Sequence, residues 1–240
     1  GNPLALVMPR LDAADTVQAR LLVDAYLHAQ AFYEGRPGVS KTETVHRPRD
    51  AAERVRFEKV LADPPLGLDQ LEALPNGGLF HKRSLVIEPA LLLPDLLRGI
   101  DVNWATRTVL DPDAKTVNGQ AYDIVLLANG WEMQVQVPEL GLVGRLGQIE
   151  WLTSDIEAPA SAIAAGPYAI AAGRTRLWGA TFEHHRGGEP QISAAAQAEN
   201  RRSLEQLAPY WSQEAEKQVP ISRAGIRATT ADRLPVIGAW

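Results

Sequence analysis

The fold class is decided by residues 123–130, which have the sequence DIVLLANG. The apolar positions in this stretch form a continuous run and do not alternate with polar ones. A run of this kind is typical of a strand that is buried on both faces, as the strands of a parallel sheet are. The stretch therefore predicts a covered strand over 123–128 and a turn at Asn129 and Gly130.

Patterns on both sides of this run predict a mixed α/β or α+β fold in which helices cover a sheet. Helical spacing or charged composition predicts helices over 12–34, 48–63, 68–74, 90–97 and 193–211. Extended patterns predict strands over 42–46, 79–87, 102–110, 115–117, 147–152, 168–171, 176–182 and 221–229. Asp12 or Asp15 is expected to cap the first helix, and residues 76–78 are expected to form a turn.

The charge and the cysteine content narrow the function classes. The 240 residues include 24 Lys and Arg and 29 Asp and Glu, which gives a net charge of −5. No overall basic field therefore attracts nucleic acid, although a local basic patch is compatible with this charge. The absence of Cys excludes disulfides, thiolate metal sites and cysteine nucleophiles, and it fits a reducing compartment. With no signal peptide and no apolar run near the ~18 residues of a membrane helix, we expect a cytoplasmic location.

Sequence motifs for nucleotide, serine or zinc chemistry do not occur in the chain. It has no Walker A loop, no Gly-x-Ser-x-Gly elbow and no His-Glu-x-x-His pair. Gly141, Gly144 and Gly147 are three residues apart, which differs from the dinucleotide-binding fingerprint. His184 and His185 are adjacent, and in an extended segment they point to opposite faces, so we expect no metal site.

Two places in the chain are candidate ligand sites. Asn129 and Gly130 follow the strand expected over 123–128, and ligands of open α/β sheets bind at the carboxyl ends of strands. A simple turn explains these two residues equally well. Arg227 lies within an apolar strand, where its planar guanidinium suits a bidentate grip on a carboxylate. A structural salt bridge is the alternative for Arg227.

Four segments together resemble the D-amino-acid oxidase superfamily of FAD enzymes, and within it the oxidoreductase half of the bifunctional, tRNA-modifying MnmC family. They are residues 1–11 (GNPLALVMPRL), 125–130 (VLLANG), 178–204 and 225–238 (GIRATTADRLPVIG). The third segment runs from a WGATF strand to a helix with ENRRSL, which separates this family from ordinary amine oxidases. The resemblance implies a substrate domain with a mixed sheet and helices, together with part of an FAD-binding domain.

The same resemblance implies how the chain is divided. Residues 1–40 and 100–150 are expected to belong to the FAD-binding domain, 41–99 and 151–225 to the substrate domain, and 226–240 to the return toward the FAD-binding domain. The family's Gly-x-Gly-x-x-Gly unit, its closing segment and its methyltransferase half do not occur in the chain. Because the chain also starts without Met and ends within an expected strand, we expect an excerpt that is inactive by itself; a processed terminus is the alternative.

The activity implied by the resemblance is FAD-dependent oxidation of a carbon–nitrogen bond. The family's substrate is a tRNA wobble uridine with a carboxymethylaminomethyl group, which is an N-substituted glycine. The flavin takes a hydride from the glycine α-carbon, and water hydrolyses the resulting imine to glyoxylate and the aminomethyl nucleoside. FAD is thus the implied cofactor, tRNA is the implied partner, and a methyltransferase domain is implied elsewhere in the parent protein.

The resemblance also assigns roles to residues by their position in the four segments. Arg227 in Gly-Ile-Arg matches the arginine with which glycine-type oxidases of the superfamily hold the substrate carboxylate. Six residues are expected beside FAD. Gly1 and Asn2 are expected near the flavin or its phosphates, and Met8 and Pro9 near the flavin ring. Asn129 and Gly130 are expected near the adenosine.

Two other interpretations of the chain stay open. A flavoenzyme for a free glycine-type amine would use the same arginine and flavin. The two enzymes would differ only at the opening of the active site, because tRNA needs an open and positively charged surface there. Four arginines within residues 47–56 are candidates for a basic strip, although a solvated helix face explains them as well. The last interpretation is a truncated, non-catalytic fragment that binds no flavin.

Overall fold

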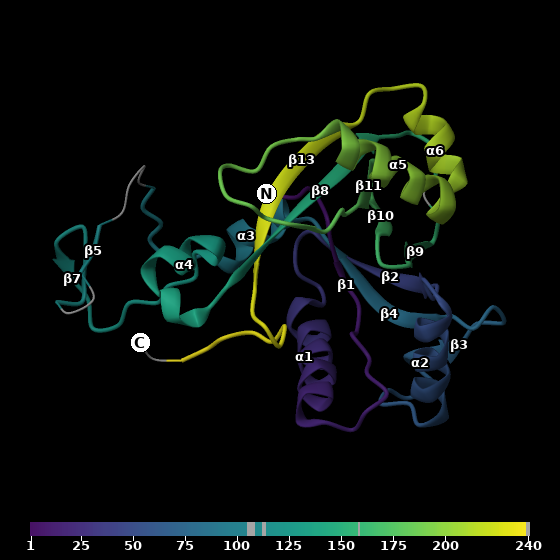
Figure 1. Cartoon of the computed structure of the whole chain (residues 1–240), viewed down its shortest axis with the longest axis horizontal. Coiled ribbons are helices and arrows are strands. Elements are labelled where there is room, and N and C mark those ends of the chain that lie inside the picture. Colours follow the sequence, from purple (N-terminus) through teal and green to yellow (C-terminus); the bar gives the residue numbers. More distant parts are fainter. Residues whose placement is uncertain (105–108, 112–113, 158, 239–240) are drawn as a thin grey trace.

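The computed structural model describes residues 1–104, 109–111, 114–157 and 159–238. Its centre is a mixed sheet in the order β1-β4-β2-β9-β10-β11-β8-β12, to which β13 adds on β8 and β3 adds on β4 (Figure 1). The strands of this sheet are β1 (Ala5–Val7), β2 (Val39–His46), β3 (Leu71–Ala73), β4 (Leu79–Ile87), β8 (Val143–Thr153), β9 (Ser161–Ala164), β10 (Tyr168–Ala172), β11 (Thr175–Gly179), β12 (Glu183–His184) and β13 (Ile221–Thr229).

The predicted mixed architecture is confirmed, but the prediction for residues 123–128 is wrong. These residues form no strand, and the side chains of Ile124 and Leu126 are 76% and 87% exposed. In the described residues, the central sheet has antiparallel pairings apart from the parallel pair β2–β9. An apolar run becomes a strand only where a neighbouring strand satisfies its backbone groups, and the described residues place none beside 123–128.

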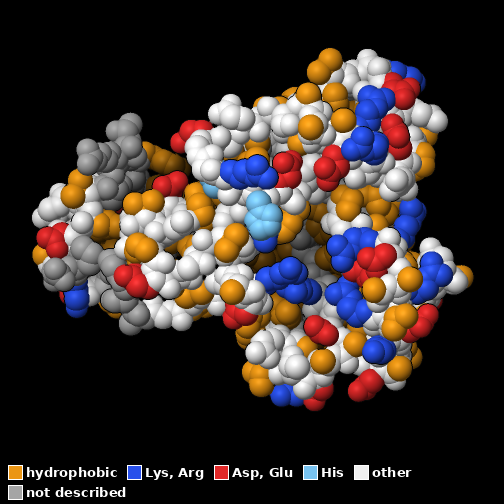
Figure 2. All heavy atoms as spheres, in the orientation of Figure 1, with side chains coloured by type: hydrophobic (Ala, Val, Ile, Leu, Met, Phe, Trp, Pro, Cys, Tyr) orange, Lys and Arg blue, Asp and Glu red, His pale blue; other side chains and the backbone are white. Residues whose placement is uncertain are grey.

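The region around this run forms a separate lobe of short elements. It contains β5 (Leu110–Asp111), β6 (Thr116–Val117) and β7 (Gln120–Ala121), followed by η1 (Gly130–Glu132), α4 (Met133–Gln136) and η2 (Pro138–Leu140). A strand was predicted over 102–110. Residues 102–104 form no strand, and residues 105–108 lie outside the described residues. Figure 1 shows this lobe at the opposite end of the molecule from β3, and Figure 2 shows hydrophobic atoms on its surface.

Helices α1 (Val17–Tyr33) and α2 (Ala51–Ala62) pack against the β3–β4 end of the sheet. The residue that caps α1 is Thr16, whose hydroxyl accepts a hydrogen bond from the backbone N–H of Ala19 at 3.1 Å, so the prediction of Asp12 or Asp15 is wrong. Buried side chains from both helices meet those of the strands in one core cluster, which includes Val23, Tyr26, Phe57, Val60, Leu71 and Leu79.

Two further expectations about helices need correction. Residues 68–74 contain strand β3 instead of a helix, because Leu71–Ala73 pair with the edge of β4. The helix predicted over 193–211 is two helices, α5 (Ala194–Leu207) and α6 (Pro209–Ala215). Proline has no backbone N–H to continue the first helix, and it begins the second one. By contrast, β4 and β13 match the predicted ranges 79–87 and 221–229, and α3 (Pro89–Leu96) begins at a proline, as expected.

The middle of the sheet is buried on both of its faces. On one face, Leu204, Leu207 and Trp211 of α5 and α6 cover Leu152 and Trp178. On the other face, Ile149, Ile170 and Leu177 pack with Leu4 and Val86. The sheet therefore holds β8 rigidly, and β13 pairs with β8 along nine successive residue pairs. In the part of the chain that the structure describes, no helix is both long and apolar enough to cross a membrane.

Candidate functional site

Strand β13 presents one row of exposed side chains that includes two arginines. Alternate residues of a strand point to the same face, so Arg223, Gly225 and Arg227 share one face. All three are exposed, while the residues between them are half-buried. A Cβ atom added to Gly225 would meet no atom within 4 Å. The backbone between the two arginines is therefore open to a flat ligand. We call this surface the arginine face.

Arg227 forms no salt bridge within the described residues, and neither does Arg145, its direct partner on β8. Two like charges at directly opposite positions of a ladder destabilise the pairing unless an anion balances them. This arrangement argues against the alternative that Arg227 is part of a structural ion pair. It suits the binding of an anionic ligand.

The first residues of the chain lie against the same face. The guanidinium Nη1 of Arg223 donates a hydrogen bond to the backbone oxygen of Gly1 at 2.8 Å. Gly1 and Asn2 are both exposed there. The structure thus brings two of the expected cofactor-binding residues to the face that carries Arg227, although they are more than two hundred positions apart in the sequence.

Tyr168 belongs to this face, and the sequence analysis missed it. The paired residues Tyr168, Gly179, Ile149 and Arg223 form one row across β10, β11, β8 and β13, so their side chains share a face. Burial raises the pKa of Tyr168, and the nearby positive charge of Arg227 lowers it in part. The sequence signal that could have identified it is a Tyr, with its polar hydroxyl, at the start of a strand of small apolar residues. A phenol O–H near a guanidinium can donate to the same carboxylate.

Asn129 and Gly130 lie elsewhere. They line a hollow of about 380 Å³ together with Trp131, Ile226 and the loop of residues 188–190. Ile226 and Arg227 are successive strand residues and point to opposite faces of β13. Gly130 has a positive φ of 64° and begins η1, which agrees with the turn interpretation. The structure therefore does not bring Asn129 and Gly130 together with Arg227.

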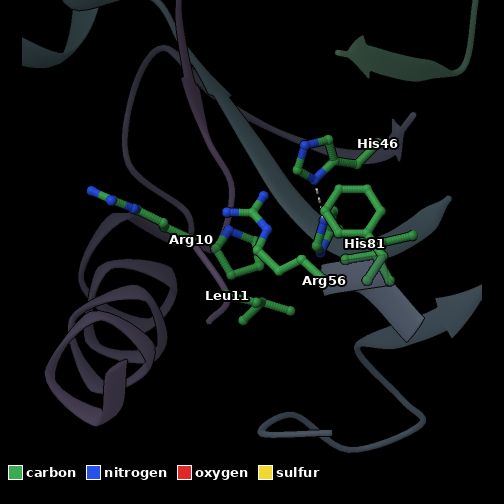
Figure 3. Close-up of a pocket in the computed structure, with 8 residues that line it drawn as sticks. Arg10, Leu11, His46, Arg56 and His81 are labelled. Atoms are coloured by element: carbon green, nitrogen blue, oxygen red, sulfur yellow. Dashed lines mark hydrogen bonds between the residues drawn. The ribbon is translucent and has the colours of Figure 1, made fainter. Parts of the chain in front are cut away.

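Met8 and Pro9 are also separate from the arginine face. Met8 is half-buried, and Pro9 is buried at a small cavity of about 40 Å³. The cavity lies between the β1–α1 connection, α2 and the sheet, and it is lined by Pro9, Arg10, Leu11, His46, Arg56, Phe57, Leu79 and His81 (Figure 3). We call it the histidine cavity.

The two imidazoles of the histidine cavity are held as a neutral pair. The Nε2 atom of His81 lies 3.4 Å from Nδ1 of His46, and the dashed line in Figure 3 joins them. Burial lowers the pKa of His46 to about 4 and that of His81 to about 3. Both rings are therefore uncharged at neutral pH. No group of three or more His, Asp or Glu among the described residues could hold a metal ion.

The arginines considered for a basic strip near α2 are partly neutralised. Arg49 and Arg56 both pair with the buried Glu53, at 2.9 and 2.6 Å. Arg47 donates to the backbone oxygen of Gln206 at 3.2 Å. This segment therefore offers less free positive charge than its sequence suggests.

One known protein family matches nearly the whole chain. The sequence profile of the DAO family, described as "FAD dependent oxidoreductase", matches residues 11–240. The chain belongs to this family. The family is one of FAD-dependent oxidoreductases, so the chain is an FAD-dependent oxidoreductase domain.

Curated relatives from two bacteria match the whole chain. The chain is 32% identical over 265 residues to the tRNA 5-methylaminomethyl-2-thiouridine biosynthesis bifunctional protein MnmC of Caulobacter sp. (strain K31), and it is 30% identical over 251 residues to that of Maricaulis maris (strain MCS10). These matches include 100% and 99% of the chain but only 43% and 40% of the relatives. The chain thus spans about two fifths of the length of these proteins.

Solved structures share the fold. Iminodiacetate oxidase from Chelativorans sp. BNC1 superposes with a TM-score of 0.64 at 17% identity, covering 94% of this chain and 73% of that one. Glycine oxidase from Geobacillus kaustophilus gives 0.62 at 18% identity, covering 92% and 68%. At these identities the likeness shows the fold alone.

The arginine face fits the family's cofactor in one respect. The open backbone at Gly225 leaves room for a flat ring, because a side chain at this position would occupy the space above the strand. The arginine face therefore has room for the ring of the cofactor. The Gly-x-Gly-x-x-Gly fingerprint that binds the pyrophosphate of a dinucleotide does not occur in the sequence.

Proposed function

We propose that this chain is the substrate-binding part of an FAD-dependent enzyme that oxidises a C–N bond of the carboxymethylaminomethyl group on a tRNA wobble uridine. The observation that carries the proposal is Arg227, an exposed arginine without an ion-pair partner among the described residues, which lies near Tyr168 and beside the open backbone at Gly225. The similarity to MnmC proteins over the whole chain supports the tRNA substrate.

In this proposal the chain's residues bind and orient the glycine end of the modified uridine. The guanidinium of Arg227 holds the carboxylate through two parallel N–H···O bonds, and the phenol of Tyr168 donates a further hydrogen bond. Both groups fix the direction of the α-carbon next to the carboxylate. FAD, when bound, supplies the acceptor for the hydride that leaves this carbon. Loss of the amine proton leaves an imine, and water hydrolyses it to glyoxylate and the aminomethyl uridine.

We propose two groups of cofactor-binding residues. Gly1 and Asn2 lie on the arginine face, where they could contact the flavin. We also propose that Met8 and Pro9 contact the flavin ring and that Asn129 and Gly130 contact the adenosine; Pro9 lines the histidine cavity, and Asn129 and Gly130 line the hollow beside Ile226. The division into FAD-binding and substrate segments stays a prediction, with its boundaries at about residues 40, 100, 150 and 225.

The parent protein is part of the same proposal. We infer that tRNA is its macromolecular partner and that it acts in the cytoplasm, where tRNA is modified. Because its relatives are named bifunctional and the chain spans about two fifths of their length, we also propose a fused methyltransferase domain.

The test is nucleoside mass spectrometry of tRNA from cells that lack the gene. We expect carboxymethylaminomethyl uridine to accumulate, because its oxidation is blocked. A gene for the Arg227→Ala variant should fail to restore the wild-type nucleoside profile. An unchanged profile in the deletion strain would exclude the tRNA reaction.

A free glycine-type amine is the second candidate substrate, and the exposure of Arg227 favours it as much as it favours tRNA. Anaerobic addition of iminodiacetate to the FAD-loaded protein distinguishes the two. Rapid flavin bleaching by the free amine, together with an unchanged tRNA profile, would support this candidate. A protein that remains colourless when FAD is added would instead support a non-catalytic fragment.

A further inference from the structure

A row of three basic side chains crosses three adjacent strands next to the arginine face. Arg145 of β8 is paired with Arg227 of β13 on one side and with His184 of β12 on the other. Residues at directly opposite positions of a ladder point to the same face, so the three side chains share it. Figure 2 shows Lys, Arg and His side chains near the middle of the view, with Asp or Glu side chains beside them.

An exposed aromatic ring lies within this row. The ring of Phe182 is 58% exposed, and the guanidinium carbon of Arg145 lies 5.4 Å from its centroid. A similar pair occurs at the end of α1, where Arg36 of the following loop lies 4.5 Å from the ring centroid of Phe32. The two pairs differ in charge balance. Arg36 forms a salt bridge with Asp95 at 3.0 Å, whereas Arg145 has no acidic partner among the described residues.

The nearest acidic side chain in sequence does not balance the row. Glu183 precedes His184 on β12 and is paired with Leu146, so it points to the opposite face. The chain as a whole has a net charge of −5, which makes an unbalanced basic row a local feature. An arginine plane and an exposed aromatic ring are the combination with which proteins bind unpaired nucleotides: bases stack on the ring, and phosphate oxygens pair with the guanidinium.

We propose that Phe182, Arg145 and His184 form an RNA-binding rim beside the substrate carboxylate site. Phe182 stacks on an unpaired base of the anticodon loop, and Arg145 and His184 contact the phosphates that flank the modified uridine. This inference rests on the proposed function, because it takes Arg227 as the residue that holds the carboxylate of the same nucleotide. The rim selects tRNA over a free amine, since a free amine has neither base nor phosphate to offer it.

The test measures binding of a fluorescein-labelled anticodon stem–loop RNA with an unmodified wobble uridine to the FAD-loaded protein that contains this chain. The unmodified RNA lacks the carboxylate, so the contact with Arg227 does not contribute to the measured affinity. We expect Phe182→Ala to weaken binding about tenfold, as loss of one base–aromatic stack does. Arg145→Ala should weaken binding and reduce the slope of log K against log salt by about one.

Phe32→Ala is the matched control, because it removes another ring that is exposed (42%) and lies beside an arginine, but on a helix outside the sheet. It should bind the RNA like the wild type, and flavin absorbance checks that each variant is folded. The inference is overturned if the wild type does not bind the RNA, if Phe182→Ala and Arg145→Ala bind as well as the wild type, or if Phe32→Ala is equally weak. RNA binding with the expected losses but without any oxidation of modified tRNA would overturn the proposed function and leave the rim in place.

Discussion

The arginine face and the histidine cavity both contain polar groups that have no charged partner, yet they differ in every other respect. Arg227 is exposed on a strand that is fixed by nine residue pairs, and its charge is permanent. His46 and His81 are enclosed between α2 and the sheet, and burial keeps them neutral. An exposed, unbalanced charge can be satisfied by a ligand, whereas a buried neutral pair contributes to packing. This difference is the reason to place substrate binding at the first region and stability at the second.

The largest expected effect is on the packing of the histidine cavity. Phe57 is 1% exposed and lies edge-on to His46, with 4.7 Å between the ring centroids. We expect Phe57→Ala to lower the free energy of unfolding by about 3–5 kcal/mol, because a large core side chain leaves a cavity. Urea denaturation measures this change. Arg227→Ala is the matched comparison on the arginine face. It should leave the free energy of unfolding unchanged or raise it slightly, because it removes the like charge opposite Arg145; an equal loss would remove the distinction between the two regions.

The histidine cavity should also make stability depend on pH. The unfolded chain takes up protons on these histidines near pH 6.5, whereas the folded chain takes them up only near pH 4 for His46 and near pH 3 for His81. Stability is therefore complete above pH 6.5 and is lost as the pH falls. By pH 4 the loss from His46 alone is about 3 kcal/mol. Urea midpoints between pH 7 and pH 4 test this slope.

The double variant His46→Gln and His81→Gln separates this effect from the titration of carboxylates. Its unfolding free energy should be lower at pH 7 and should change less between pH 6.5 and pH 4 than that of the wild type. If the slope is the same in both proteins, the histidine pair does not determine the acid sensitivity.

On the arginine face, the contribution of Tyr168 should be smaller. Tyr168→Phe removes one hydrogen-bond donor to the carboxylate, so we expect kcat/KM to fall about tenfold. The unfolding free energy should change little, because the ring remains in place. Steady-state oxidation of the modified tRNA measures the first quantity. A variant as active as the wild type would exclude Tyr168 from the carboxylate site.

A small gain in stability is expected at Gly225. Gly225→Ala adds a Cβ atom in open space and removes the conformational freedom of glycine, so it should stabilise the fold by up to about 1 kcal/mol. The same methyl group narrows the space above the strand and should weaken FAD-dependent turnover. Thermal unfolding and activity are measured on the same sample. A gain in activity would contradict the view that the bare backbone serves a ligand.

The sequence predicted some parts of this molecule to the residue and others not at all. Strands β4 and β13 were predicted correctly because turn residues or a change of pattern mark both of their ends. Residues 123–128 have a stronger apolar pattern, but a pattern cannot show whether a partner strand lies alongside. Proline at position 209 was a visible helix-breaking signal, and it divides the predicted helix.

The sequence could identify a residue of the candidate site only where that residue was unusual in its own segment. Arg227 could be selected because a charge within an apolar strand is costly without a partner. The contact of Gly1 with Arg223 and the closeness of Tyr168 to Arg227 depend on strand order across the whole sheet. No local pattern encodes that order. For the same reason the sequence did not show that Pro9 and Asn129, predicted for the flavin ring and the adenosine, lie at two different hollows.

The most direct test of the central claim is the anaerobic rate of flavin reduction by an anticodon stem–loop that carries carboxymethylaminomethyl uridine. If Arg227 holds the carboxylate, the wild type reduces its flavin with this RNA, and Arg227→Ala does so about 100-fold more slowly, as expected for the loss of a charged, bidentate contact. Arg227→Lys should recover only part of the rate. Equal rates for the wild type and Arg227→Ala would contradict the claim that the arginine face is the carboxylate site.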